Sequence, residues 1–299
     1  MMKKSTLIAL ALCLVVGGIG ISVAGIALGG KTSLSWDQSG LRFNSWDENP
    51  IEYDISYKSS NKRVFDGMIE ELNDFSKMDI TSGTVDVTVK EGEDYSICID
   101  VGSKVDLNYG VRGDTLYIEQ EGHRTGWNFI SPNARKDYSG KIIVTVPQDK
   151  KLEKANVMLG VGEGLFENIE TEKFSLMAGV SSTNIQGLTA DYVTIEGGVG
   201  ELNLEGSNLG EAKITMGVGR VKLETALTGD MDIEGGIGEL DIILDGEEQD
   251  FNYEISRGGG SIKINDQRYS GMGYVEVRNK SNQTIEIEAG LGSINIETN

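Results

Sequence analysis

The chain has 299 residues, enough for one large domain or two small ones, and its two cysteines are too few for a fold held together by disulfides. Its formal net charge is −20, and all 47 acidic residues lie after position 36. A surface of this sign repels nucleic acids and anionic lipids, so nucleic-acid binding is excluded as a function.

The N-terminal segment predicts a membrane anchor. Residues 5–30 carry no charge, with Lys3 and Lys4 before them and Lys31 after them, and this run exceeds the ~20 residues with which a helix crosses the hydrocarbon. The basic end predicts a cytoplasmic tail of residues 1–4 with the rest of the chain outside. A cleaved signal peptide is the alternative, because Ser22-Val23-Ala24 fits a small-x-small cleavage pattern. We expect a single-pass protein of the cell membrane with its N-terminus inside.

The next two stretches lead into a β domain. Residues 31–74 form a juxtamembrane segment, in which the helical spacing of Phe65, Ile69 and Leu72 predicts a short helix that caps the following fold. Residues 75–150 show period-2 alternation between Asp- and Gly-rich turns and are expected to form N-terminal strands, with an insert at 121–140. The expected strands are 78–80, 84–89, 95–101, 115–119 and 142–146.

From 151 to 299 the chain is organised by a repeat. Its leading glycines recur every 19 residues at Gly160, Gly179, Gly198, Gly217 and Gly236, and two looser copies follow at Gly258 and Gly290. A period near 20 with strand-like flanks is typical of a solenoid, and copies in the same phase favour parallel stacking over an antiparallel meander. The expected fold class is all-β: a single-stranded parallel β-solenoid, β-helix-like with 19-residue coils, preceded by one N-terminal transmembrane helix.

Apolar residues recur at positions −5, −3, +1 and +6 relative to each leading glycine, and we expect these columns to face the core. Around Gly217 they are Ala212, Ile214, Val218 and Leu223. Glycines at 0 and +2 permit a sharp bend repeated in register. Outward columns alternate in charge where coils stack, as in the series Glu201, Arg220, Glu239.

The repeats indicate no catalytic, cofactor-binding or metal site. Segments 197–205 and 235–243 approach the calcium nonapeptide GGxGxDxUx, but Leu202 and Leu240 occupy its ligand position, and Ca²⁺ needs six or more oxygen ligands. The sole histidine, His123, has no recognisable catalytic partner, and the turns are too short to wall a cleft. We therefore expect a non-enzymatic protein with no cofactor.

The 121–140 insert is the candidate for partner contact, because it gathers aromatic and basic residues on an otherwise acidic chain. Such residues are frequent in interface hot spots, and a basic patch favours an acidic partner such as an anionic cell-wall polymer. The alternative is a mobile hairpin tip or a loop that covers one end of the solenoid. The candidate contact residues are His123, Arg124, Trp127, Phe129 and Arg135.

Several motifs resemble a bacterial family. The strand ending in Val144-Thr145-Val146-Pro147 and the rungs Gly260-Ser-Ile-Lys-Ile264 and Gly292-Ser-Ile-Asn-Ile296, behind an N-terminal anchor, resemble the putative-adhesin family of β-strand-repeat proteins, a domain of unknown function. The resemblance covers residues 75–299 and defines no functional residues. It implies a β-solenoid outside the cytoplasmic membrane with no established activity. We expect an adhesin or surface-binding module that contacts a cell-envelope polymer or a membrane protein. An envelope-sensing or regulatory role is the alternative, and the expected state is a monomer.

Overall fold

The structure, a computed structural model, describes residues 33–37, 40–44, 56–57, 69–102, 104–120, 139–269 and 273–299. In these ranges the protein is all-β, with one 3₁₀ turn, η2 (Glu248–Asp250). The strands are β1 (Ser33–Asp37), β2 (Gly40–Asn44), β3 (Ser56–Tyr57), β4 (Ile69–Glu71), β5 (Lys77–Ser82), β6 (Val85–Gly92), β7 (Ser96–Val101), β8 (Leu107–Arg112), β9 (Thr115–Gln120), β10 (Gly140–Pro147), β11 (Leu152–Glu167), β12 (Glu170–Gln186), β13 (Thr189–Leu227), β14 (Met231–Leu244), β15 (Asn252–Ile264), β16 (Gln267–Tyr269), β17 (Gly273–Val277) and β18 (Thr284–Thr298).

β1 pairs with β2 alone, and the other sixteen strands form one continuous sheet. None of the helices in the ranges given above is long and apolar enough to cross a membrane. The predicted anchor, residues 5–30, lies outside the described residues.

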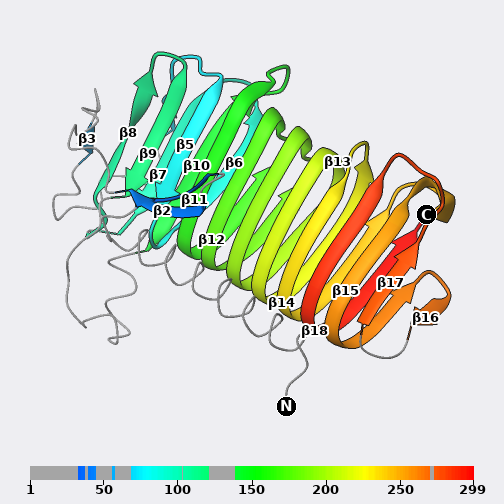
Figure 1. Ribbon diagram of the computed structural model, residues 1–299. Coiled ribbons are helices and arrows are strands. Elements are labelled where there is room, and N and C mark those ends of the chain that lie inside the picture. The colour runs from blue at the N-terminus through cyan, green and yellow to red at the C-terminus, as the bar shows by residue number, and fades with distance from the viewer. Residues whose placement is uncertain are drawn as a thin grey trace.

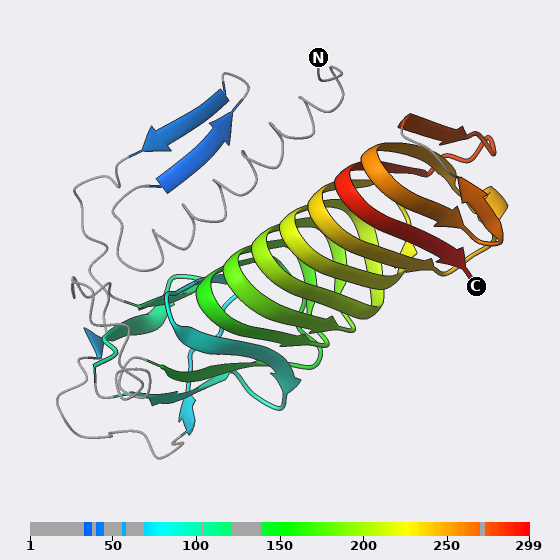
Figure 2. The same cartoon turned by 90° about the horizontal axis from the view of Figure 1, so that it is seen from below.

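The large sheet winds into a stack of coils (Figures 1 and 2). Each coil has a first arm before the leading glycine and a second arm after it, and the neighbouring coils from β11 to β14 pair in parallel with a 19-residue offset. Val157 pairs with Leu176, which pairs with Ile195, and Ile214 pairs with Ile233. β13, with 39 residues, supplies two coils in one unbroken strand. These registers confirm the predicted parallel solenoid with 19-residue coils and rule out the meander.

The stack begins before the repeat that the sequence reveals. β5 and β6 form a coil against β11, and β9 and β10 form the next coil outward. Beyond them β8 and β7 run antiparallel to β9 and β10. The expected strands are confirmed, and β8 is an additional strand.

The predicted helix around Ile69 is wrong over its described part. Residues Ile69–Glu71 form β4, which pairs antiparallel with the edge of β7, and Ile69 itself is 73% exposed. The open edge of β7 offers backbone hydrogen-bond partners, and three apolar residues at helical spacing cannot compete with them.

At the C-terminal end the strand order departs from the chain order. β18 lies between β14 and β15 and runs parallel to both, so that Ile287 pairs with Ile233 on one side and Ile255 on the other (Figure 1). β17 and β16 then close the outer edge of β15 as antiparallel strands. The last segment of the chain is thus buried as an internal coil.

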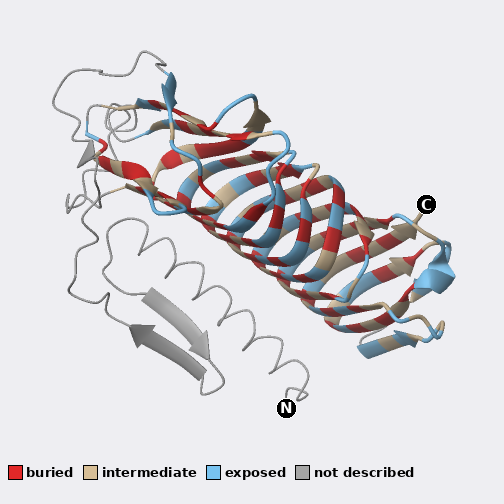
Figure 3. Cartoon of the chain, turned by 90° about the horizontal axis from the view of Figure 1, so that it is seen from above, coloured by how far each residue is buried: buried red, intermediate tan, exposed pale blue. Residues whose placement is uncertain are grey.

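Aliphatic ladders between the two arms make the core, and buried and exposed residues alternate along every coil (Figure 3). The columns predicted inward at −5, −3 and +6 are buried, as Ala212, Ile214 and Leu223 illustrate. Further core positions lie at −1 and +4, where the same coil places Met216 and Val221.

The prediction is wrong for the +1 column, which faces solvent. Its six aliphatic members are between 41% (Val161) and 56% (Leu291) exposed. The reason is the position of the bend. Counted from the leading glycine, the inward positions are odd-numbered on the first arm and even-numbered on the second arm. The change takes place at the leading glycine itself, so position +1 already follows the alternation of the second arm. Position +1 therefore points away from the core.

Candidate functional site

The predicted partner-contact residues His123, Arg124, Trp127, Phe129 and Arg135 all lie outside the described residues. The structure does show where the insert leaves and re-enters the fold. β9 ends at Gln120 and β10 begins at Gly140, as the two arms of one coil. The side-chain oxygen of Gln120 accepts hydrogen bonds from the backbone N–H groups of Gly83 and Thr84, at 2.8 and 2.9 Å. These bonds fix the end of β9 to the bend of the neighbouring coil.

The corrected +1 column forms a continuous surface feature, which we call the aliphatic ridge. Each member is paired in register with the next or lies on the adjacent coil. Rungs of a sheet lie ~4.8 Å apart, so the ridge is about 24 Å long. It ends at β15, where Gly259 pairs with Leu291. The ridge consists of Val161, Val180, Val199, Val218, Ile237 and Leu291.

The glycines beside the ridge are required by close backbone approach. A Cβ added at Gly219 would lie 1.8 Å from the carbonyl oxygen of Gly200, and one at Gly238 would lie 1.7 Å from that of Gly219. Their φ angles, +151° and +157°, are also rarely adopted by residues with side chains. Because the coils stack backbone on backbone here, the +1 side chains are the groups that project from the bend.

Carboxylates flank the ridge on both sides. Outward position −2 on the first arm and outward position +3 on the second arm are the nearest side-chain columns. Arg220 is the sole basic residue of these two columns along the ridge, and it pairs with Glu239 across 2.9 Å. Burial raises the pKa of the Glu196 carboxyl, and Lys213 partly offsets that effect. The flanking carboxylates are Glu196, Glu234 and Glu288 at −2, and Glu163, Glu201 and Glu239 at +3.

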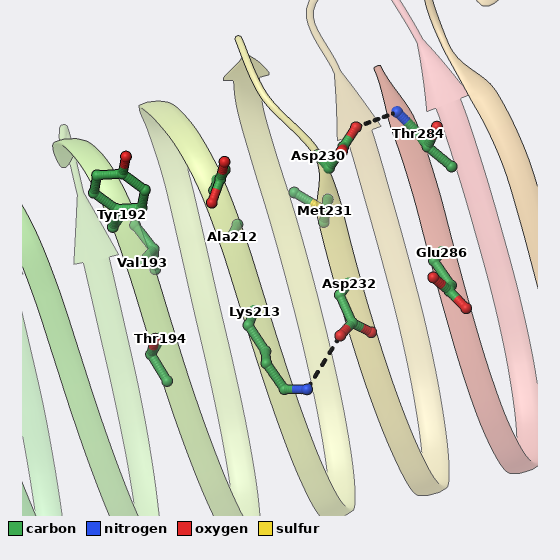
Figure 4. Close-up of a pocket in the computed structure, with 11 residues that line it drawn as sticks. Tyr192, Val193, Thr194, Ala212, Lys213, Asp230, Met231, Asp232, Thr284 and Glu286 are labelled. Atoms are coloured by element: carbon green, nitrogen blue, oxygen red, sulfur yellow. Dashed lines mark hydrogen bonds and ion pairs between the residues drawn. The ribbon is translucent and has the colours of Figure 1, made fainter. Parts of the chain in front are cut away.

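The outer face of the first arms carries a shallow groove of ≈ 400 Å³ on the side of the acidic −2 column (Figure 4). Its lining includes Asp230, Asp232 and Glu286, with Lys213 as the one basic side chain. The Lys213 ammonium lies 3.1 Å from a carboxylate oxygen of Asp232, whereas Asp232 and Glu286 stand on paired rungs as like charges. The insertion of β18 therefore places like charges side by side.

The carboxylates in and beside this groove repel one another. Burial raises the pKa of the Glu286 carboxyl, and the neighbouring carboxylates of Asp232, Glu254 and Glu288 raise it further. In the part of the chain that the structure describes, no group of three or more His, Cys, Asp or Glu side chains is arranged to hold a metal ion. The groove and the ridge flank together present a negative surface beside an apolar one.

Comparison with known proteins places these features in context. A family profile described as Toastrack DUF4097 matches residues 75–265. Among solved structures, a putative adhesin from Bacteroides fragilis has 13% identity and a TM-score of 0.39, covering 77% of this chain and 95% of that one. A putative cell adhesion protein from Clostridium sporogenes has 16% identity and a TM-score of 0.32, covering 78% and 98%. No curated protein matches the chain.

Proposed function

The chain belongs to the Toastrack DUF4097 family, and from this premise we propose that it is a non-enzymatic, membrane-anchored, extracytoplasmic β-solenoid that binds a partner along its outer surface. The aliphatic ridge carries the proposal. Its six side chains are 41–56% exposed and stand in one line on consecutive coils. Contiguous exposed apolar surface with a polar rim is typical of an interaction site, whereas isolated exposed apolar residues are ordinary.

The scaffold is suited to this role because the backbone fixes the ridge. Parallel pairing holds every rung in register, and the glycine contacts leave the bend little room to move. A preorganised row of side chains loses little conformational entropy when a partner binds. Binding along a stack of coils is also the usual use of solenoid surfaces.

The location outside the membrane rests on the N-terminal sequence. Residues 5–30 are uncharged between Lys4 and Lys31, which supports an anchor with the N-terminus inside, and the acidic remainder suits a solvated exterior. Thiol labelling tests this in a chain carrying Cys13→Ser and Cys98→Ser. A cysteine at Lys222 should react with a membrane-impermeant reagent on intact cells, whereas one at Met2 should react only after lysis. Labelling of both positions only after lysis would contradict the location.

Partner binding is tested with the full chain in its own cells. Chemical cross-linking on intact cells, followed by quantitative mass spectrometry, should recover a partner with the wild type and with Lys222→Ala. The Val199→Ser/Val218→Ser variant should lose it, because these changes remove apolar ridge surface without touching the core. The same partner set from all three chains would contradict the proposal. An integral membrane protein as the partner would favour the envelope-sensing role over adhesion to a polymer.

We keep the 121–140 insert as a second proposed contact. Its basic and aromatic residues suit an anionic envelope polymer, which the acidic ridge flanks would repel. Replacing residues 123–136 with a short Gly-Ser turn should leave folding intact and abolish polymer binding. Lost folding would make the insert a cap of the solenoid, and unchanged polymer binding would remove it as a contact.

A further inference from the structure

We propose that the aliphatic ridge and its carboxylate flanks dock a basic amphipathic helix, one whose apolar stripe is bordered by lysine or arginine residues. This inference rests on the proposed function and names the class of partner for the same surface. It combines two features of the described coils: an apolar line at +1 and acidic columns on either side of it.

The spacing of the ridge matches a helix. Its rungs recur every ~4.8 Å, close to the 5.4 Å at which an α-helix repeats its apolar face, and a ridge of about 24 Å corresponds to a helix of ~16 residues. A strand laid along the ridge would present same-face side chains only every ~6.7 Å, which falls out of step with the rungs within two or three positions.

The charge of the flanks determines the sign of the partner. The −2 and +3 columns along the ridge contain six glutamates and one arginine, Arg220. Arg220 pairs with Glu239, and Lys213 of the outer −4 column pairs with Glu234 across 3.1 Å, so the carboxylates still outnumber the basic groups beside the ridge. The acidic groove with Asp232 and Glu286 extends the negative potential away from the ridge on the first arm. Such a surface attracts a cationic partner and accelerates its association, and salt screens both effects.

The same charges disfavour other occupants. Two copies of this chain meeting ridge to ridge would bring glutamate columns such as Glu201 and Glu239 against each other, and like charges across an interface oppose association. An anionic lipid surface or an anionic polymer would meet the same repulsion. The uncharged segment 5–30 lacks the basic border that the flanks require.

The experiment uses the full chain in nanodiscs of zwitterionic lipid and a labelled 18-residue peptide that forms a leucine stripe bordered by lysines. Fluorescence anisotropy at low and high salt should show binding that weakens as salt rises. The Val199→Ser/Val218→Ser/Ile237→Ser variant should bind about tenfold more weakly or worse, because the apolar contact is lost. The Glu196→Gln/Glu201→Gln/Glu234→Gln variant should lose affinity and part of the salt dependence, because it removes three of the six flanking carboxylates.

Matched controls decide the outcome. A peptide with glutamate in place of lysine, and one with the same composition scrambled, should bind weakly, and empty nanodiscs correct for lipid binding. Equal binding of the scrambled peptide, or an unchanged serine variant of normal melting temperature, would overturn the inference. Self-association that the serine variant abolishes would instead assign the ridge to a second copy. If the peptide fails while capture on cells still depends on the ridge, the proposed function stands and this partner class is wrong.

Discussion

Replacing Ile214 with aspartate tests the assignment of inward and outward positions most severely. Ile214 is fully buried in the −3 ladder and pairs in register with Ile233. Losing a buried isoleucine and leaving a cavity costs ~2–5 kcal/mol, and an unpaired buried carboxylate adds several kcal/mol more. The total is comparable to the ~5–15 kcal/mol by which whole domains are stable. We therefore expect Ile214→Asp to unfold the coils around it.

Val218→Asp is the matched control, because it lies four residues later in the same strand. Val218 belongs to the ridge and is 44% exposed, so its carboxylate would stay hydrated and the cost should remain within ~1 kcal/mol. A second control, Lys222→Ala, removes the 2.6 Å ion pair with Glu205, and exposed pairs of this kind contribute ~1 kcal/mol or less.

Urea unfolding followed by far-UV circular dichroism compares the three variants by their midpoints. We use midpoints because a stack of coils need not unfold in one step. Ile214→Asp should show a large loss of midpoint or no folded baseline, and the controls should stay close to wild type. Equal losses for Ile214→Asp and Val218→Asp would refute the inward and outward assignment.

Three further predictions concern single positions. Gly235→Ala should be tolerated or stabilising, because a Cβ at this position would meet no atom of the described residues within 4 Å. Gly238→Ala should lower the melting temperature sharply, because its Cβ would lie 1.7 Å from the carbonyl oxygen of Gly219. Equal effects of the two changes would contradict the stacking geometry. Tyr253→Phe should leave the urea midpoint unchanged or raise it, because the buried hydroxyl has no hydrogen-bond partner among the described residues. A loss above ~1 kcal/mol would show that the hydroxyl is bonded. Glu286→Gln should raise stability at pH 7 by ~0.2–1 kcal/mol, because it removes repulsion with Asp232. The raised pKa of Glu286 means that its carboxyl group binds a proton more tightly in the folded state than in the unfolded state. The gain in stability from Glu286→Gln should therefore vanish as the pH falls below 4.5, the ordinary pKa of the group. A gain that persists below that pH would contradict the electrostatic cause.

The solenoid could be predicted because its determinants are local and periodic. Glycines recur at a fixed 19-residue spacing, and each is preceded by an aliphatic residue at −3. Every repeat therefore has its bend and its strand at the same positions, and only parallel stacking places these equivalent residues side by side. The strand patterns around Ile80 and Val144 were equally readable, since alternation is independent of the partner strand.

The misassigned features depend on tertiary geometry. The alternation of inward and outward positions changes at the bend, and the sequence does not directly mark the residue at which it changes. Valines such as Val199 and Val218 fit an inward position as well as an outward one. The buried apolar side chains at −1, such as Leu159 and Met216, and the buried column at +4, which includes Leu202, are the signal that could have located the bend correctly.

The exchange of β15 and β18 was not readable for a different reason. Both strands carry the same Gly-Ser-Ile-x-Ile pattern, from Gly260 and from Gly292, so either fits the place beside β14. The antiparallel strands β16 and β17 cover the outer edge of β15 and leave the inner place to β18. The candidate site followed from the corrected column, and the sequence alone had directed attention to the 121–140 insert.

Photo-cross-linking on intact cells tests the central claim, that the ridge is the binding surface, most directly. A photoreactive amino acid is placed at Val199 on the ridge or at Lys222 on the outer face of the second arm. We predict an adduct from position 199 that maps to a basic amphipathic segment of another protein and disappears when Val180 and Val218 are changed to serine. Absence of an adduct at 199, or equal adducts from 199 and 222, would contradict the account.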